Sequence, residues 1–145
     1  MPKMNRFLLA ILLSSVATAC TRTEAASSEA GKSAAGARVE VVSKKRGEPA
    51  EGMIFVRFRV ENGGASGIGY RGWSDDSPTY TLEVQEDGAW SNYQIGWCGT
   101  GLLDFSLKPG AEMAFDVPLP ADRKTYRATF GDPPVVTPPV VAEAP

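Results

Sequence analysis

The fold is decided by the stretch Met53-Ile54-Phe55-Val56-Arg57-Phe58-Arg59-Val60-Glu61. Apolar side chains occupy every second position, while Arg57, Arg59 and Glu61 occupy positions between them. Successive side chains of a strand point to opposite faces, so this alternation predicts a strand that is buried on one face and solvated on the other. A sheet with one apolar face needs a second layer to cover it. The stretch therefore predicts an all-β sandwich or barrel.

Similar patterns recur on both sides of this stretch. We expect further strands at Val39–Val42, Thr79–Gln85, Trp90–Ile95, Leu103–Leu107, Met113–Leu119 and Tyr126–Phe130. Turn sequences such as Glu86-Asp87-Gly88 and Lys108-Pro109-Gly110 separate several of them, and no segment shows a convincing helical period. The spacing predicts a single antiparallel β-sandwich of about seven or eight strands with Greek-key connections, over residues 38–130.

Two stretches resemble parts of immunoglobulin-like and fibronectin-III-like bacterial domains. Leu107-Lys108-Pro109-Gly110, followed by an alternating strand, is similar to a corner common in such domains. Asp122–Tyr126 resembles a tyrosine corner, in which the tyrosine hydroxyl bonds a backbone group upstream. The resemblance implies an immunoglobulin-like sandwich over residues 38–130. It implies almost nothing about function.

The first twenty residues have the pattern of a secretory signal. Lys3 and Arg6 precede the apolar run Phe7–Leu13, and small or short residues then lead to Cys20. This arrangement resembles the lipobox of bacterial lipoproteins, which implies removal of residues 1–19 and lipidation of Cys20. The alternatives are a plain signal peptide cut near Ala19 and a transmembrane anchor, for which the apolar run is short.

The lipoprotein resemblance also implies a location. The residue after the cysteine is Thr21 and not an aspartate. In the sorting pattern of bacterial lipoproteins, an aspartate at this position would favour retention at the inner membrane. In a double-membraned bacterium this favours an outer-membrane lipoprotein that faces the periplasm. Residues 20–37 then read as the lipidated cysteine and a flexible Ala-, Ser- and Gly-rich tether. Residues 131–145 contain five prolines and are expected to form a disordered, polyproline-like tail.

Composition excludes several classes of function. The chain has no histidine, which removes the commonest general base, the usual catalytic triads and the commonest zinc ligand. Loss of Lys3 and Arg6 would leave 13 basic residues against 17 acidic ones, a net charge of −4. We therefore expect no nucleic-acid partner, no cofactor and no bound metal. The basic cluster Lys44-Lys45-Arg46 reads as a solvated hairpin tip, with contact to an anionic lipid or polymer as the alternative.

The segment Gly96-Trp97-Cys98-Gly99-Thr100-Gly101 is the most unusual part of the sequence. It reads first as a tight connection, with Trp97 closing one end of the sandwich and Cys98 acting as a small apolar residue. It could instead be a binding loop, or Cys98 could be the nucleophile of a thiol enzyme. The last option needs an activated thiolate and has no histidine to supply it.

A second segment, Tyr70–Pro78, holds Asp75 and Asp76 between serines. These residues are typical of a turn, while calcium binding is the alternative and would need further oxygen ligands. The middle third of the chain is also rich in aromatic residues, namely Tyr70, Trp73, Trp90, Tyr93 and Trp97. They belong to the core if they point inward, or to a sugar- or peptide-stacking platform if they share a surface.

Together these features predict a lipid-anchored, extracytoplasmic binding or structural accessory module without catalytic activity. The membrane would hold it through Cys20, and its partner would be an envelope protein or a polysaccharide. The alternative function is binding of carbohydrate or cell-wall polymer through surface aromatics. The residues expected at the contact surface are Arg71, Trp73, Trp97, Cys98 and Thr100.

Overall fold

Antiparallel strands, with no helix among them, build the part of the chain that the computed structural model describes, residues 36–47, 52–96 and 99–145. The expected signal sequence, Cys20 and nearly all of the expected tether lie outside these ranges. The all-β prediction is confirmed for the described residues. They form eleven strands, of which three contain only two residues, against the seven or eight expected.

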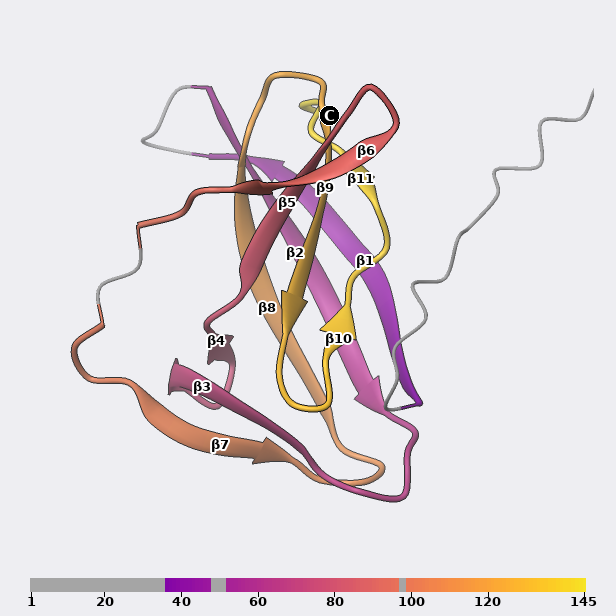
Figure 1. Ribbon diagram of the computed structural model, residues 1–145, viewed down its shortest axis with the longest axis vertical. Helices are drawn as coiled ribbons and strands as arrows, with labels where there is room; N and C mark the ends of the chain where they lie inside the picture. The colour runs from indigo at the N-terminus through magenta and orange to yellow at the C-terminus, as the bar shows by residue number, and fades with distance from the viewer. Residues whose placement is uncertain (1–35, 48–51, 97–98) are drawn as a thin grey trace, which may run out of the picture.

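The strands are arranged in three sheets within the described ranges (Figure 1). The first has the order β1-β2-β8, formed by β1 (Ala37–Arg46), β2 (Met53–Asn62) and β8 (Glu112–Pro120). The second has the order β10-β9-β5-β6, formed by β10 (Val135–Val136), β9 (Thr125–Phe130), β5 (Thr81–Glu86) and β6 (Ala89–Tyr93); β11 (Val140–Val141) also pairs with β9. The third has the order β4-β3-β7, formed by β4 (Ser77–Pro78), β3 (Ile68–Ser74) and β7 (Leu103–Leu107).

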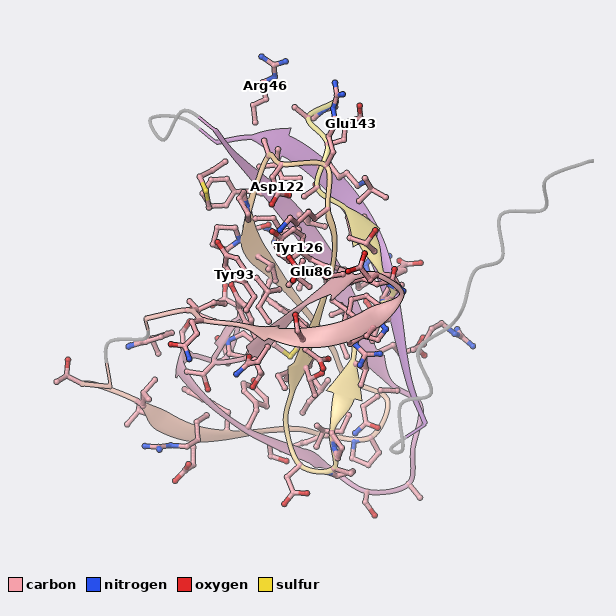
Figure 2. The ribbon with its side chains drawn as sticks, turned by 45° about the horizontal axis from the view of Figure 1, so that its top comes forward. Arg46, Glu86, Tyr93, Asp122, Tyr126 and Glu143 are labelled. Carbon is pink, nitrogen blue, oxygen red and sulfur yellow. The ribbon has the colours of Figure 1, made fainter. Side chains whose placement is uncertain are left out.

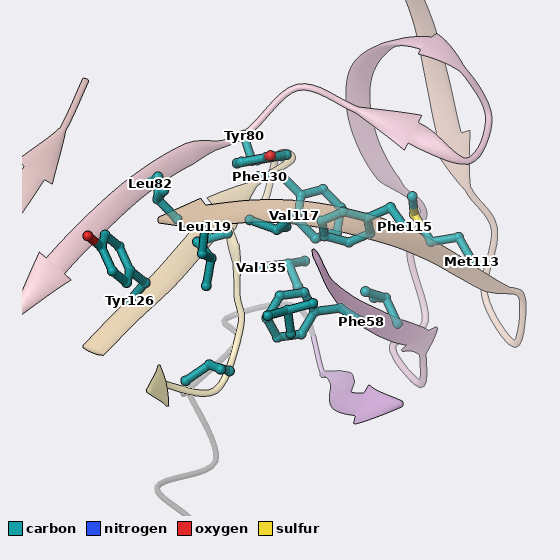
Figure 3. Packing of buried hydrophobic residues seen from close by; sticks show 14 of the residues in the cluster. Phe58, Tyr80, Leu82, Met113, Phe115, Val117, Leu119, Tyr126, Phe130 and Val135 are labelled. Carbon is teal, nitrogen blue, oxygen red and sulfur yellow. The ribbon is translucent and has the colours of Figure 1, made fainter. Parts of the chain in front are cut away.

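The predicted alternation of β2 is confirmed by its burial. Its inward side chains, Ile54, Val56, Phe58 and Val60, are at most 2% exposed, and the charged residues between them are not buried. Apolar residues of β8 lie beside them in the same sheet, and apolar residues of β5 and β9 join them from the second sheet, which gives the molecule a sandwich-like core (Figure 3). The core members from these strands include Leu82, Val84, Met113, Phe115, Val117, Leu119, Tyr126, Ala128 and Phe130.

Strand β3 was not predicted, because its sequence combines glycines with a run expected to be a loop. It pairs with β7 from Ile68↔Leu107 to Gly72↔Leu103. Near its start, the other edge of β3 contacts the residues that follow β9, since the backbone N–H of Gly69 and that of Asp132 each donate to the other residue's carbonyl, at 2.9 and 2.7 Å. The third sheet is thereby hydrogen-bonded to the segment that follows β9.

The prediction of a disordered tail at 131–145 is wrong. Val135, Val140 and Ala142 are at most 4% exposed, and β10 and β11 both pair with β9. Between the two short strands, the Ala128 N–H donates to the buried Thr137 hydroxyl at 2.9 Å, so a side chain replaces a missing backbone acceptor. Pro138 and Pro139 fit here because they interrupt an edge strand, where a missing N–H is tolerated.

The basic cluster Lys44-Lys45-Arg46 forms the end of β1 and not a hairpin tip, since these residues pair with β2. The Lys44 Nζ donates to the Val141 carbonyl at 3.1 Å, which links the edge of the first sheet to β11. The predicted hairpin at Glu86-Asp87-Gly88 is confirmed. Asp87 and Gly88 adopt positive φ angles of 51° and 81° between β5 and β6.

Candidate functional site

A tight hairpin between β3 and β4 positions Trp73. At Gly72, an added Cβ would lie 2.5 Å from the Ser77 carbonyl oxygen, so only glycine allows the two strands to approach this closely. The backbone N–H of Thr79 donates to the Arg71 carbonyl at 2.8 Å on the far side of the hairpin. Trp73 follows Gly72 directly and is half-buried.

The turn of this hairpin is held by its own side chains. The Tyr70 hydroxyl donates to the Asp75 carbonyl at 2.6 Å, and the Ser74 hydroxyl donates to Asp76 Oδ1 at 2.6 Å. Burial raises the pKa of Tyr70, with a smaller contribution from the charges of Asp75 and Asp76, so its hydroxyl stays protonated as the donor. In the described ranges no three acidic or cysteine residues gather as metal ligands, and these two aspartates act in a turn.

The indole N–H of Trp73 donates to the Thr100 carbonyl at 3.1 Å. The structure therefore brings together two of the expected contact residues, from β3 and from the loop before β7. Arg71 lies in a separate shallow hollow beside Asp104 and Phe105, with its Nε 3.6 Å from Asp104 Oδ1. Trp97 and Cys98 lie outside the described residues.

Trp73 lines a groove of about 340 Å³ between the β3–β4 hairpin and the first sheet. We call it the Trp73 groove. Its lining residues are Arg57, Trp73, Asp76, Ser77, Pro78, Tyr80, Ala114, Phe115, Asp116 and Pro118. The groove thus combines one indole ring, two prolines and three charged side chains.

The charged part of the groove comes mainly from β2 and β8. Arg57 and Asp116 lie opposite each other in the strand register, and Arg57 Nη1 is 3.1 Å from Asp116 Oδ2. Both side chains are nearly half exposed, so they can still bond to a ligand. Tyr80 lies at the inner side and is 6% exposed; burial raises its pKa, so its hydroxyl is protonated.

Sequence reasoning did not find Arg57, Asp116 or Tyr80 as site residues. Arg57 was recognised only as an outward position of an alternating strand, and Asp116 was not singled out, because an outward charge is usually solvated. Their juxtaposition depends on the register between β2 and β8, two strands 59 residues apart at this pair. No local signal in the sequence encodes that register.

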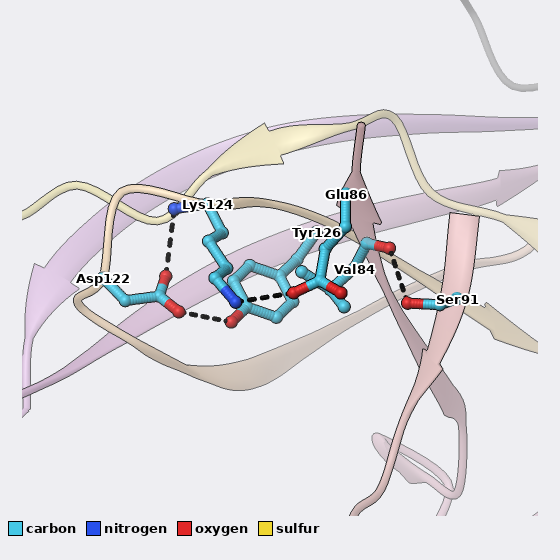
Figure 4. A network of polar contacts seen from close by, with 6 residues as sticks. All are labelled: Val84, Glu86, Ser91, Asp122, Lys124 and Tyr126. Atoms are coloured by element: carbon cyan, nitrogen blue, oxygen red, sulfur yellow. Dashed lines mark hydrogen bonds and ion pairs between the residues drawn. The ribbon is translucent and has the colours of Figure 1, made fainter. Parts of the chain in front are cut away.

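A second polar cluster lies at the end of the sandwich where Arg46 and Glu143 are also found (Figure 2). The Tyr126 hydroxyl donates to Asp122 Oδ2 at 2.8 Å, and the Lys124 backbone N–H donates to Asp122 Oδ1 at 3.0 Å (Figure 4). The expected tyrosine corner thus uses a carboxylate, where a backbone group was expected. Lys124 Nζ also lies 2.7 Å from Glu86 Oε1.

The pKa values of this second cluster are shifted in the direction that strengthens it. Burial raises the pKa of Tyr126, and its hydrogen bond to Asp122 adds to the effect. The hydrogen bond with Glu86 raises the pKa of Lys124, which keeps that ammonium charged. Since each of these groups bonds to a neighbour within the cluster, we assign the cluster to stability.

The aromatic residues of the middle third that the structure describes do not form one platform. Tyr70 is 8% exposed and belongs to the core. Trp90 is on β6, with the Arg127 guanidinium 4.2 Å above its ring, and does not line the Trp73 groove. Tyr93 is 38% exposed and packs edge-on against Tyr126 at 5.4 Å between ring centroids. Trp73 is thus the indole of the groove.

Comparisons with known proteins are sparse. No family model matches the chain, and no curated protein matches it. Among solved structures, the chain is similar to the crystal structure of a Bordetella pertussis protein carrying the name ApaA, with 15% sequence identity and a TM-score of 0.47. That match covers 75% of this chain and 94% of the other.

In the described ranges there is no helix of the length and apolarity that crossing a membrane requires.

Proposed function

We propose that this protein is a lipid-anchored extracytoplasmic binding module, which contacts its partner in the cell envelope through the Trp73 groove. The groove itself carries the proposal. It combines a fixed indole with the Arg57–Asp116 pair, and these side chains remain partly accessible. Binding sites typically combine apolar surface with a few placed polar groups. We assign no catalytic role to the chain.

The anchor is the second part of the proposal. It rests on the N-terminal pattern, in which Lys3, Arg6 and the apolar run Phe7–Leu13 precede Cys20. Lipidation with two or more chains gives stable membrane attachment, whereas one chain of modest length is marginal. With Thr21 after the cysteine, we place the protein at the outer membrane, facing the periplasm of a double-membraned cell.

We also propose that the sandwich is of the immunoglobulin-like type. Two features support this assignment. The Gly110 N–H donates to the Asn62 carbonyl at 2.7 Å in the corner before β8, and Tyr126 closes the opposite end through Asp122. A structure of the same chain with a different strand connectivity would overturn it.

The anchor is tested by the substitution Cys20→Ser in the otherwise unchanged chain. We expect the variant to move from the membrane pellet to the soluble fraction after cell lysis, while Cys98→Ser stays in the pellet. If Cys20→Ser still sediments with the membrane, the lipid anchor is refuted.

The contact surface is tested by photo-crosslinking in intact cells. The crosslinker is placed at Asp75, an exposed residue in the hairpin turn that does not itself line the groove. A matched control carries it at Gln85, which is exposed on β5. We expect a discrete envelope adduct from Asp75 and none from Gln85. The same adduct from both positions, or none from Asp75, would contradict the assigned surface.

A further inference from the structure

We propose that the Trp73 groove binds a neutral or N-acetylated hexose ring of an envelope polysaccharide. This inference rests on the proposed binding function and names its ligand. The groove presents an indole, two carboxylates and a guanidinium together, and this combination carries the inference. It gives roles to Arg57, Asp76 and Asp116, which the sequence did not single out as contact residues.

Trp73 supplies the apolar element that a sugar ring needs. One face of a hexose carries C–H groups and packs against a flat indole. The Trp73 ring is held in place by the hydrogen bond that its N–H donates to the Thr100 carbonyl at 3.1 Å. A ring that is already fixed loses little conformational freedom when the ligand binds.

The polar groups around the indole match a ring that carries hydroxyls at its edge. Asp116 and Asp76 offer carboxylate oxygens that accept from hydroxyls, and Arg57 offers donors. Asp116 already accepts from Arg57 at 3.1 Å, and Asp76 from Ser74 at 2.6 Å. Both carboxylates are therefore oriented, and each retains further acceptor capacity, since an ionised carboxyl has about four acceptor sites.

The same charges disfavour other ligands. Two carboxylates beside one guanidinium give the groove a negative balance, which opposes phosphate and acidic sugars. A purely apolar ligand would strip water from all three charged groups without replacing their hydrogen bonds. The volume of about 340 Å³ is near the lower end of the usual range for small-molecule sites, which suits one or two sugar units of a longer chain.

The experiment measures retention of the full-length, detergent-solubilised protein on insoluble chitin and on purified peptidoglycan. Trp73→Ala removes the indole, and Asp116→Asn keeps the shape of the groove while removing its charge. Trp90→Ala is the matched control, because that indole is also half-buried but lies on β6 beneath Arg127. Circular dichroism of each variant checks that the fold is intact.

We expect wild type and Trp90→Ala to be retained on at least one polymer. Trp73→Ala should bind about tenfold more weakly or worse, and Asp116→Asn several-fold more weakly. If Trp73→Ala is unfolded, Asp116→Asn decides the matter. Equal retention of folded Trp73→Ala or Asp116→Asn and wild type would overturn the inference.

The failure of this inference can be told apart from failure of the proposed function. No retention of wild type on either polymer, combined with a protein adduct at Asp75, refutes the sugar ligand and keeps the groove as a protein contact. No retention and no adduct refutes both.

Discussion

At the scale of single residues, Tyr126 links the core to the polar end of the sandwich. It is 1% exposed and its ring packs against Tyr93, while its hydroxyl reaches Asp122 at 2.8 Å. Asp122 in turn accepts from the Lys124 backbone, so one carboxylate fixes the turn that leads into β9. A buried hydroxyl that loses its acceptor is costly, whereas removal of both partners costs less.

We therefore expect Tyr126→Phe to lower the free energy of unfolding by about 1 kcal/mol, the usual net value of one hydrogen bond. Asp122→Ala should cost more, because it leaves both the tyrosine hydroxyl and the Lys124 N–H without their acceptor. Urea denaturation of the two variants and of wild type measures this order. A smaller loss for Asp122→Ala than for Tyr126→Phe would contradict this account of the turn.

The buried tyrosines also predict how stability depends on pH. Burial raises the pKa of Tyr80 in the folded protein. In the unfolded chain a tyrosine has its ordinary pKa of about 10. Below that pH both states hold the proton and the stability is fully present. Above it the unfolded state loses its proton first, so the free energy of unfolding falls as pH rises. Tyr80→Phe should make this alkaline decline shallower, as measured by urea denaturation between about pH 9 and pH 11. An unchanged slope would exclude Tyr80 as a source.

At the scale of elements, the predictable strands are those with simple alternation. The patterns of β2, β5, β8 and β9 were readable because one face of each lies on the core. Strand β3 was missed because Gly69 and Gly72 replace side chains at points of close backbone approach. The strands β10 and β11 were missed because of the prolines between them. Prolines favour an extended chain, and that chain can be either an ordered edge strand or a disordered tail.

The close approach of the two strands in the β3–β4 hairpin yields a prediction about stability. Gly72→Ala places a Cβ 2.5 Å from the Ser77 carbonyl and 2.9 Å from the Ser74 carbonyl, both of them backbone atoms. The hairpin must open, and we expect a loss of about 1–3 kcal/mol in stability. Gly96→Ala is the control, since an added Cβ there would meet nothing within 4 Å and the substitution should be nearly neutral. Thermal unfolding of both variants tests this, and equal midpoints would contradict the steric role of Gly72.

At the scale of the whole molecule, the sandwich is closed by its C-terminal residues. Val135, Val140 and Ala142 complete the same core to which β2 and β8 contribute. The sequence permitted the core of β2, β5, β8 and β9 to be predicted, and two of the expected site residues, Trp73 and Thr100, do meet. It did not permit prediction of Arg57 beside Asp116, which depends on how distant strands align.

Removal of residues 131–145 should therefore unfold the domain or leave it only partly ordered. Burying one valine side chain is worth roughly 1.5–3 kcal/mol, and the deletion removes two such side chains as well as two strand pairings. A typical domain has only about 5–15 kcal/mol of stability to lose. Limited proteolysis of the shortened chain should show rapid degradation. A shortened chain as resistant as wild type would restore the idea of a dispensable tail.

The bond from Lys44 to the Val141 carbonyl lies at a sheet edge where another molecule could add a strand. An unpaired strand edge is a template on which a neighbouring molecule can add its own strand. Here the edge of β1 carries a bulge between Val41 and Ser43 and the charges of Lys44, Lys45 and Arg46, while Pro138 and Pro139 interrupt the edge beside it. We therefore expect that molecules at high density do not add strands to one another along this edge.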